Sequence, residues 1–206
     1  MKVSKGNGSG SLNIAILMGF MLLLCACGSK SAVPSNYDKI SLAVGLSQKE
    51  ALQKLDIREE QLCEDTLVGI YGIPEQAKFE EFVFATQLGF DMTTEKKELM
   101  DIQYVLDLSE DSKKNKETGL KIFSLLEKAY GKATSSNIKE NLHDDFQSGT
   151  ASWDLTNKAE KNIKTYMTEL ESRYNGSAQY LLDLLICGDD GDAPRIILMY
   201  KVRVMR

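Results

Sequence analysis

The chain has few of the residues on which common active sites depend. Its 206 residues include one histidine, three prolines and one tryptophan. A single histidine argues against a histidine-rich zinc site and against a histidine-based catalytic triad. The 25 basic residues are fewer than the 30 acidic ones, so we expect no general electrostatic binding to nucleic acid. With 43% hydrophobic and 27% charged residues, the composition is that of a globular protein with one domain or two small ones.

The longest apolar run lies near the start of the chain and is short. It extends from Ile14 to Leu24 and contains no charged residue. A membrane-spanning helix needs ~20 apolar residues, so this run is too short to be a comfortable span. Lys2 and Lys5 precede the run, and small residues follow it. This order of basic, apolar and small residues predicts an export signal.

The end of the apolar run carries a more specific pattern. Leu24-Cys25-Ala26-Cys27 resembles the lipobox of bacterial lipoproteins, with leucine three positions before the modified cysteine. The resemblance implies a diacylglyceryl group on the Cys27 thiol, cleavage just before it, and extracytoplasmic anchoring to the membrane. Cys25 is the rival, but the bulky Leu24 directly before it suits the cleavage position badly. A signal cut by the ordinary peptidase and an uncleaved anchor are the alternatives.

These patterns predict three segments. We expect residues 1–26 to be a signal peptide, 27–40 to be the lipidated N-terminus and a flexible tether, and 41–206 to form a single globular domain. Cleavage would remove 26 residues and two of the 25 basic side chains, which leaves 180 residues with 23 basic and 30 acidic ones. We expect so acidic a domain to be repelled by an anionic membrane rather than to lie flat on it.

Two further cysteines, Cys63 and Cys187, lie in the expected globular domain. An extracytoplasmic compartment permits a disulfide between them. Two free thiols are the alternative, because sequence does not reveal whether their geometry suits a bond. The two cysteines are 124 residues apart in the sequence, so we expect no zinc site.

Hydrophobic periodicity predicts an α+β fold. Ser47 and Glu50 match a capping box, which predicts a helix over 48–55, and apolar residues at helical spacing predict helices over 117–130 and 163–174. Alternating or continuous apolar residues predict strands over 66–73, 82–90, 100–108, 152–155, 180–187 and 196–204. Because the strands come in hairpins, we expect an antiparallel sheet with helices packed on one face.

Candidate catalytic and metal-binding groups are scattered. Ser136 and Lys139 match the Ser-x-x-Lys pattern of penicillin-recognising enzymes, but the companion motifs are missing. His143 beside two aspartates could act as a general base, and the hairpin residues Asp189, Asp190 and Asp192 could offer oxygens to calcium. A polar loop and a hairpin turn are the simpler interpretations of these two segments. No cofactor motif is present, so we expect no cofactor.

The segment Val44–Leu55 resembles the opening helix of small outer-membrane lipoproteins of the SmpA/OmlA type, and β-lactamase-inhibitor-like modules share this outline. The chain departs from that pattern by adding a second long helix and hairpin after Ser152. The resemblance implies a non-enzymatic module that scaffolds or binds protein at the cell envelope, and no binding residue carries over. We therefore expect a lipoprotein that binds an envelope protein or ligand. The alternative is an envelope hydrolase that acts on cell-wall or peptide substrates.

Overall fold

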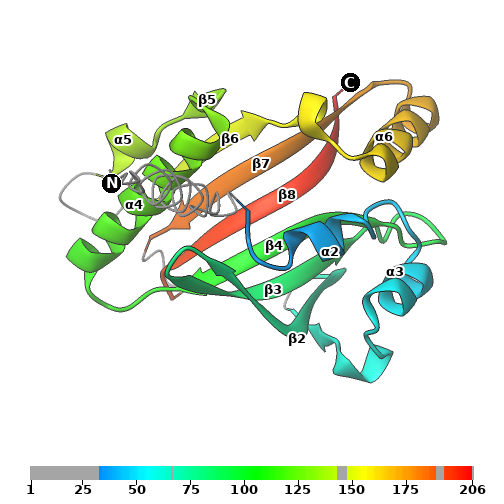
Figure 1. Ribbon diagram of the computed structural model, residues 1–206, viewed down its shortest axis with the longest axis horizontal. Coiled ribbons are helices and arrows are strands. Elements are labelled where there is room, and N and C mark those ends of the chain that lie inside the picture. The colour runs from blue at the N-terminus through cyan, green and yellow to red at the C-terminus, as the bar shows by residue number, and fades with distance from the viewer. Residues whose placement is uncertain (1–32, 66, 143–147, 189–192, 206) are drawn as a thin grey trace, which may run out of the picture. The chain divides into compact units, whose positions relative to one another are not determined.

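One antiparallel sheet dominates the structure, a computed structural model that describes residues 33–65, 67–142, 148–188 and 193–205 (Figure 1). Its eight strands follow the order β1-β2-β3-β4-β8-β7-β6-β5. Their bounds are β1 Cys63–Glu64, β2 Ile70–Phe79, β3 Phe82–Phe90, β4 Leu99–Asp107, β5 Ser135–Ser136, β6 Gly149–Asp154, β7 Ser177–Cys187 and β8 Arg195–Met205. Two meanders, β2-β3-β4 and β6-β7-β8, therefore meet through their third strands.

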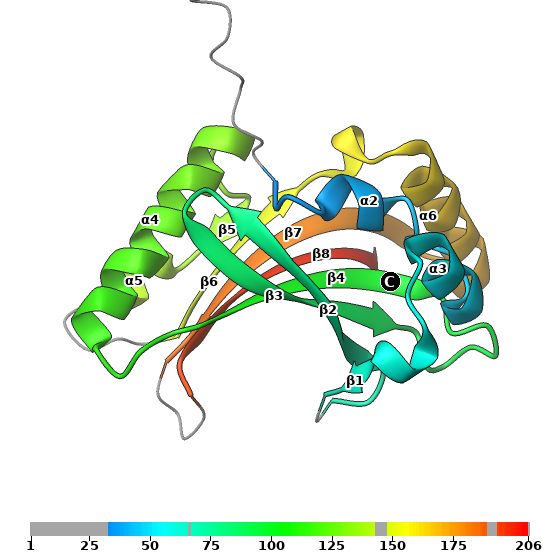
Figure 2. The ribbon, with the colours of Figure 1, turned by 60° about the horizontal axis from the view of Figure 1, so that its bottom comes forward.

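Helices lie mainly on one side of this sheet. They are α2 (Tyr37–Ser41), α3 (Gln48–Leu55), α4 (Ser112–Tyr130), α5 (Ile138–Asn141) and α6 (Lys161–Tyr174), with short 3-10 turns η1 (Glu59–Gln61) and η2 (Thr156–Lys158). Figure 2 shows the long strands as an arch, with α2, α4 and α6 on its convex side. The expected antiparallel α+β fold is confirmed, but the sheet is larger and the helical cover smaller than expected. In the described part of the chain, no helix is long and apolar enough to span a membrane.

Local signals explain the helix boundaries. The Ser47 hydroxyl accepts a hydrogen bond from the Glu50 amide at 3.4 Å, and Glu50 accepts one from the Ser47 amide at 3.1 Å, so the capping box is confirmed. Asn175 ends α6 in the left-handed conformation, at φ 51°. Helix α4 begins earlier than predicted because Asp111 caps it, accepting from the Lys114 amide at 3.1 Å. Its first turn has no apolar stripe that sequence analysis could detect.

Strand β2 continues past Pro74, contrary to expectation. The strand predicted over 66–73 was expected to end just before Pro74, because proline lacks the amide hydrogen that a strand ladder needs, yet the strand continues to Phe79. The register shifts between Ile73 and Gln76, so Pro74 lies in a bulge. There the pairing is interrupted, and the missing amide hydrogen of proline removes no hydrogen bond of the ladder.

The folded domain begins earlier than the expected boundary at residue 41. Ser35 bonds to β2, with its amide donating to the Lys78 carbonyl at 2.9 Å. Tyr37 and Ile40 of α2 are buried in the core. Residues 33–40, which we expected in the tether, therefore belong to the packed domain, because the apolar side chains of this segment fit against the sheet.

A cluster of tyrosines fixes α2 to the sheet. The Tyr37 and Tyr180 hydroxyl oxygens lie 2.5 Å apart, and the Tyr37 and Tyr200 rings lie 4.4 Å apart. The Tyr200 hydroxyl is 3.2 Å from that of Tyr130 at the end of α4. Burial raises the pKa of Tyr37 and Tyr180 far above the usual tyrosine range. These hydroxyls stay protonated at neutral pH and serve to join α2, α4 and the sheet.

Candidate interaction surface

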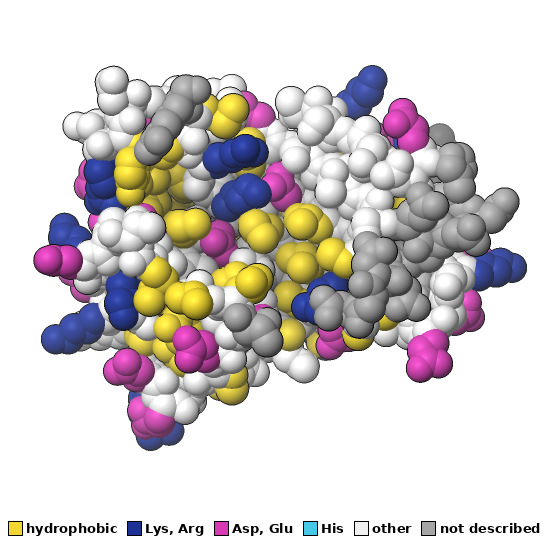
Figure 3. All heavy atoms as spheres, turned by 180° about the vertical axis from the view of Figure 1, so that it is seen from behind, with side chains coloured by type: hydrophobic (Ala, Val, Ile, Leu, Met, Phe, Trp, Pro, Cys, Tyr) yellow, Lys and Arg dark blue, Asp and Glu magenta, His cyan; other side chains and the backbone are white. Residues whose placement is uncertain are grey.

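The concave face of the sheet, which we call the open face, is the side turned away from α2, α4 and α6 (Figures 2 and 3). Side chains alternate between the two faces of each strand. On β7, for example, Leu182 and Leu184 are buried on the helix side, while Leu181 and Leu185 are half-buried on the open face. The open face is therefore identified residue by residue from the alternation and the register of the strands.

Apolar residues form a belt across the middle of the open face. Cross-strand pairing places Ala85 opposite Val105, Val105 opposite Ile197, and Ile197 opposite Leu185. Leu181 and Met199 extend the belt on β7 and β8. Figure 3 shows hydrophobic side chains gathered over the middle of this face, with charged groups among and around them. Adjacent strands lie ~4.8 Å apart, so the belt spans about 14 Å from β3 to β7.

A buried polar pair borders this belt on β4. Asp101 and Gln103 are only 6% and 5% exposed, although they lie on the open face. The Gln103 side-chain amide donates to Asp101 Oδ1 at 2.9 Å. Burial raises the pKa of Asp101 above its usual value of 3.8, while the Gln103 hydrogen bond and the charge of Lys201 oppose that shift.

Polar contacts continue across the face on both sides of this pair. On β8, Lys201 forms an ion pair with Asp183 of β7, and the Ser152 hydroxyl of β6 donates to Asp183 at 2.7 Å. On β3, the Gln87 side-chain amide donates to Asp65 at 2.9 Å. The open face thus combines an apolar belt with fixed hydrogen-bonding groups. This combination is typical of surfaces that recognise proteins, because apolar contact contributes affinity and fixed polar groups contribute specificity.

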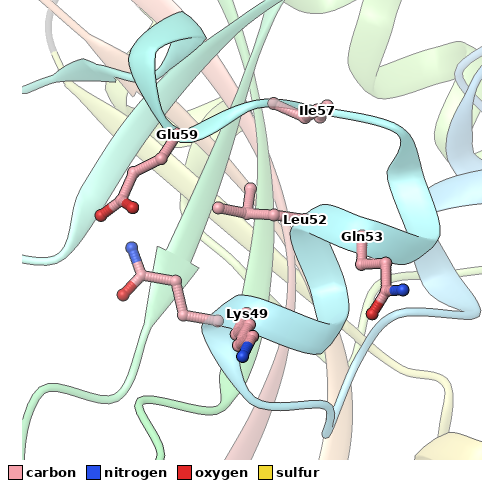
Figure 4. A pocket seen from close by; sticks show the side chains of 6 residues that line it. Lys49, Leu52, Gln53, Ile57 and Glu59 are labelled. Carbon is pink, nitrogen blue, oxygen red and sulfur yellow. The ribbon is translucent and has the colours of Figure 1, made fainter.

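Apart from the open face, a groove lies beside α3 (Figure 4). It is an open groove of about 540 Å³, with Leu52 and Ile57 as its apolar groups and Gln53 and Glu59 among its polar ones. Lys49 and Glu59 line the groove, and its described lining includes no serine, cysteine or histidine. Its polar groups can bind a ligand.

Another groove lies beside α6 and is more apolar than the groove beside α3. It is an open groove of about 510 Å³, lined by Asp91, Met100, Tyr166, Leu170, Tyr174, Val202 and Val204. Asp91 is the one carboxylate in this lining, and it accepts a hydrogen bond from the Thr93 hydroxyl at 2.6 Å. The groove therefore offers apolar contact and one carboxylate that already has a partner.

In the structure, the side chains of Ser136 and Lys139 contact other groups. Ser136 lies on β5, where its hydroxyl oxygen accepts from the Ile138 amide at 3.2 Å. The Lys139 ammonium is instead 3.4 Å from Glu127 and lies over the Phe123 ring. His143 and the calcium candidates Asp189, Asp190 and Asp192 lie outside the described residues, as does Cys27. Among the residues that the structure does describe, no group of three or more acidic, histidine or cysteine side chains could hold a metal.

Cys63 and Cys187 are not joined by a disulfide in the structure. Cys63 lies on β1 and Cys187 at the end of β7, with β2, β3, β4 and β8 between them. Five strand spacings correspond to ~24 Å along the sheet, whereas a disulfide needs Cα atoms ~4.4–6.8 Å apart. The disulfide considered from the sequence is therefore not formed, because the topology places its cysteines on distant strands.

The polar groups of the open face were not predicted from the sequence. Asp101 and Gln103 alternate with apolar residues in a strand that was predicted correctly. Asp183 and Lys201 interrupt the apolar runs of the last hairpin. Such polar residues at period two were the available signal for an uncovered sheet face, but the order of the strands was needed to place them together.

No family model, curated protein or solved structure matches this chain.

Proposed function

We propose that the protein is an extracytoplasmic lipoprotein, anchored to the membrane through Cys27, whose domain binds another protein of the cell envelope without a catalytic role. The leader and the lipobox-like residues before Cys27 support the anchor. Each buried CH₂ of an acyl chain contributes ~0.8 kcal/mol, and one chain binds only marginally, so the two chains of a diacylglyceryl group are needed for stable attachment.

The buried Asp101–Gln103 pair is the observation that most supports binding through the open face. Both side chains are almost fully buried, yet they lie on the face that α2, α4 and α6 leave uncovered. Keeping a carboxyl group there opposes stability, because burial disfavours its charged form. A fixed polar pair beside an apolar belt suits recognition of a partner protein. The hydrolase alternative receives no support from Ser136 and Lys139, whose side chains have other partners.

Site-specific photo-crosslinking in intact membranes tests this proposal. A photoreactive residue replaces the exposed Ala85 in the apolar belt, and in a matched variant it replaces the exposed Ser124 on α4. We expect a discrete crosslinked protein from position 85, none from position 124, and loss of the product when Asp101→Ala is added. No product from position 85, or one that also forms from position 124, would contradict binding through the open face.

A further inference from the structure

Basic side chains are concentrated on the helix-covered side of the domain, although the chain as a whole is acidic. Together α4, η2 and α6 contain nine basic and four acidic residues, whereas the chain contains 25 and 30. The exposed lysines of this group include Lys113, Lys114, Lys128, Lys161 and Lys164. Within the described residues, none of these five has an ion-pair partner.

The start of the folded domain lies on this same side. Tyr37 contacts Tyr200, which bonds to Tyr130 at the end of α4. The Lys158 ammonium of η2 lies 5.2 Å from the centre of the Tyr130 ring. Figure 2 shows the first described residues, in blue, above the convex side of the sheet between α4 and α2. The chain therefore enters the domain among these basic elements and opposite the open face.

A lipid on Cys27 would hold this side near the bilayer. Five residues lie between Cys27 and Val33, so an extended chain spans six residue steps, or ~21 Å at most. The Debye length is ~8 Å at physiological ionic strength, so lysines brought to the surface would feel the potential of anionic headgroups. The overall acidity of the chain does not prevent this contact, because charges more than a Debye length away are largely screened.

We propose that the helix-covered side, formed by α4, η2 and α6, docks on anionic lipid headgroups, so that the open face points away from the membrane. This inference rests on the proposed lipid anchor. The partner is a lipid surface because the basic groups are exposed, dispersed over three elements and adjacent to the entry of the chain, which suits a planar array of negative charges. This proposal is the alternative to the expectation that net acidity keeps the domain off the bilayer.

Fluorescence quenching on vesicles tests this orientation. The lipidated protein, with Cys63→Ser and Cys187→Ser, carries one fluorophore at Ser124→Cys on α4 or at Thr150→Cys on the open face. The vesicles contain phosphatidylglycerol and a nitroxide-labelled headgroup lipid. We expect strong quenching at position 124 and little at position 150. Equal quenching, or stronger quenching at position 150, would overturn the proposed orientation.

Charge reversal and salt distinguish electrostatic docking from a passive orientation. Lys113→Glu, Lys114→Glu and Lys128→Glu together should remove the difference in quenching, as should raising the salt to about 1 M, where the Debye length is ~3 Å. Each lysine near an anionic surface strengthens binding roughly fivefold. Quenching at position 124 that survives both changes would contradict docking on anionic lipid. Failure of the protein to sediment with the vesicles would instead contradict the lipid anchor.

Discussion

The carboxylate of Asp101 lies directly over Gly89, its cross-strand partner on β3. A Cβ atom at Gly89 would stand 2.2 Å from Asp101 Oδ1, which is far inside van der Waals contact. The glycine therefore provides the space in which the buried carboxyl group lies beside Gln103. This relationship connects the stability of the sheet to the polar centre of the open face.

Replacing Gly89 with alanine should displace the Asp101 carboxylate and weaken partner binding. We expect a loss of ~1–3 kcal/mol in the free energy of unfolding, since the added methyl group forces neighbouring atoms to shift. Urea denaturation and the crosslinking yield from position 85 measure the two effects. Gly72→Ala is the matched control, because its nearest neighbour, the Cys63 Cβ, lies at 3.7 Å. An equal effect of both substitutions would contradict the role of Gly89.

Asp101 should make the stability of the protein depend on pH. Its pKa is raised in the folded state above 3.8, so the ionised carboxyl opposes folding at neutral pH. This penalty declines as the pH falls through the raised pKa, whereas the Asp101→Asn variant never carries it. The stability of the variant relative to the natural protein should therefore decrease on acidification from pH 7 toward about pH 4. A difference in unfolding free energy that stays constant over this interval would contradict the burial of an ionisable group.

Glu98 should affect the pH dependence of stability in the opposite direction to Asp101. It is 3% exposed, and its two carboxylate oxygens accept from the Arg173 guanidinium at 3.0 and 2.7 Å, which lowers the pKa of Glu98 below 4.5. The pair stabilises the protein above pH 4.5, and its contribution is lost as the pH falls through the lowered pKa. We expect Glu98→Gln to cost ~2 kcal/mol at neutral pH and less in acid. Glu60→Gln, in an exposed pair with Arg58, should change stability by less than ~1 kcal/mol.

The corrected start of the domain can be tested by truncation. A chain that begins at residue 41 lacks Tyr37 and Ile40, which are buried in the core. Burial of each such side chain contributes ~1.5–3 kcal/mol, so the truncated domain should lose ~3–6 kcal/mol of unfolding free energy. A chain that begins at residue 33 serves as the control. Equal stability of the two chains would show that residues 33–40 are not part of the folded domain.

Local sequence patterns identified most of the elements because their signals are local. The capping box at Ser47 and the Asn175-Gly176 pair marked helix ends, and period-two patterns marked β3, β4 and β8. The sequence did not show that β4 and β8 pair at the centre of the sheet, since residues about 100 positions apart form that contact. Strand order depends on tertiary packing, which no local pattern specifies.

The candidate surface was harder to predict for the same reason. Asp101, Lys201 and Asp183 are close only after β4, β8 and β7 have paired. In the sequence, each is a single polar residue in an apolar strand, and such a residue is expected to face solvent. Pro74 and the segment 33–40 were misread because a bulge and a tertiary contact overrode local preferences.

Mass spectrometry of the N-terminal peptide from purified membranes can show whether the protein is anchored through Cys27. We expect the mature chain to begin at Cys27 and to carry a diacylglyceryl modification on its sulfur. Cys27→Ser should abolish the modification and release the protein from the membrane fraction or leave its leader uncleaved. A natural protein that retains an intact, unmodified leader in the cytosol would rule out the lipid anchor.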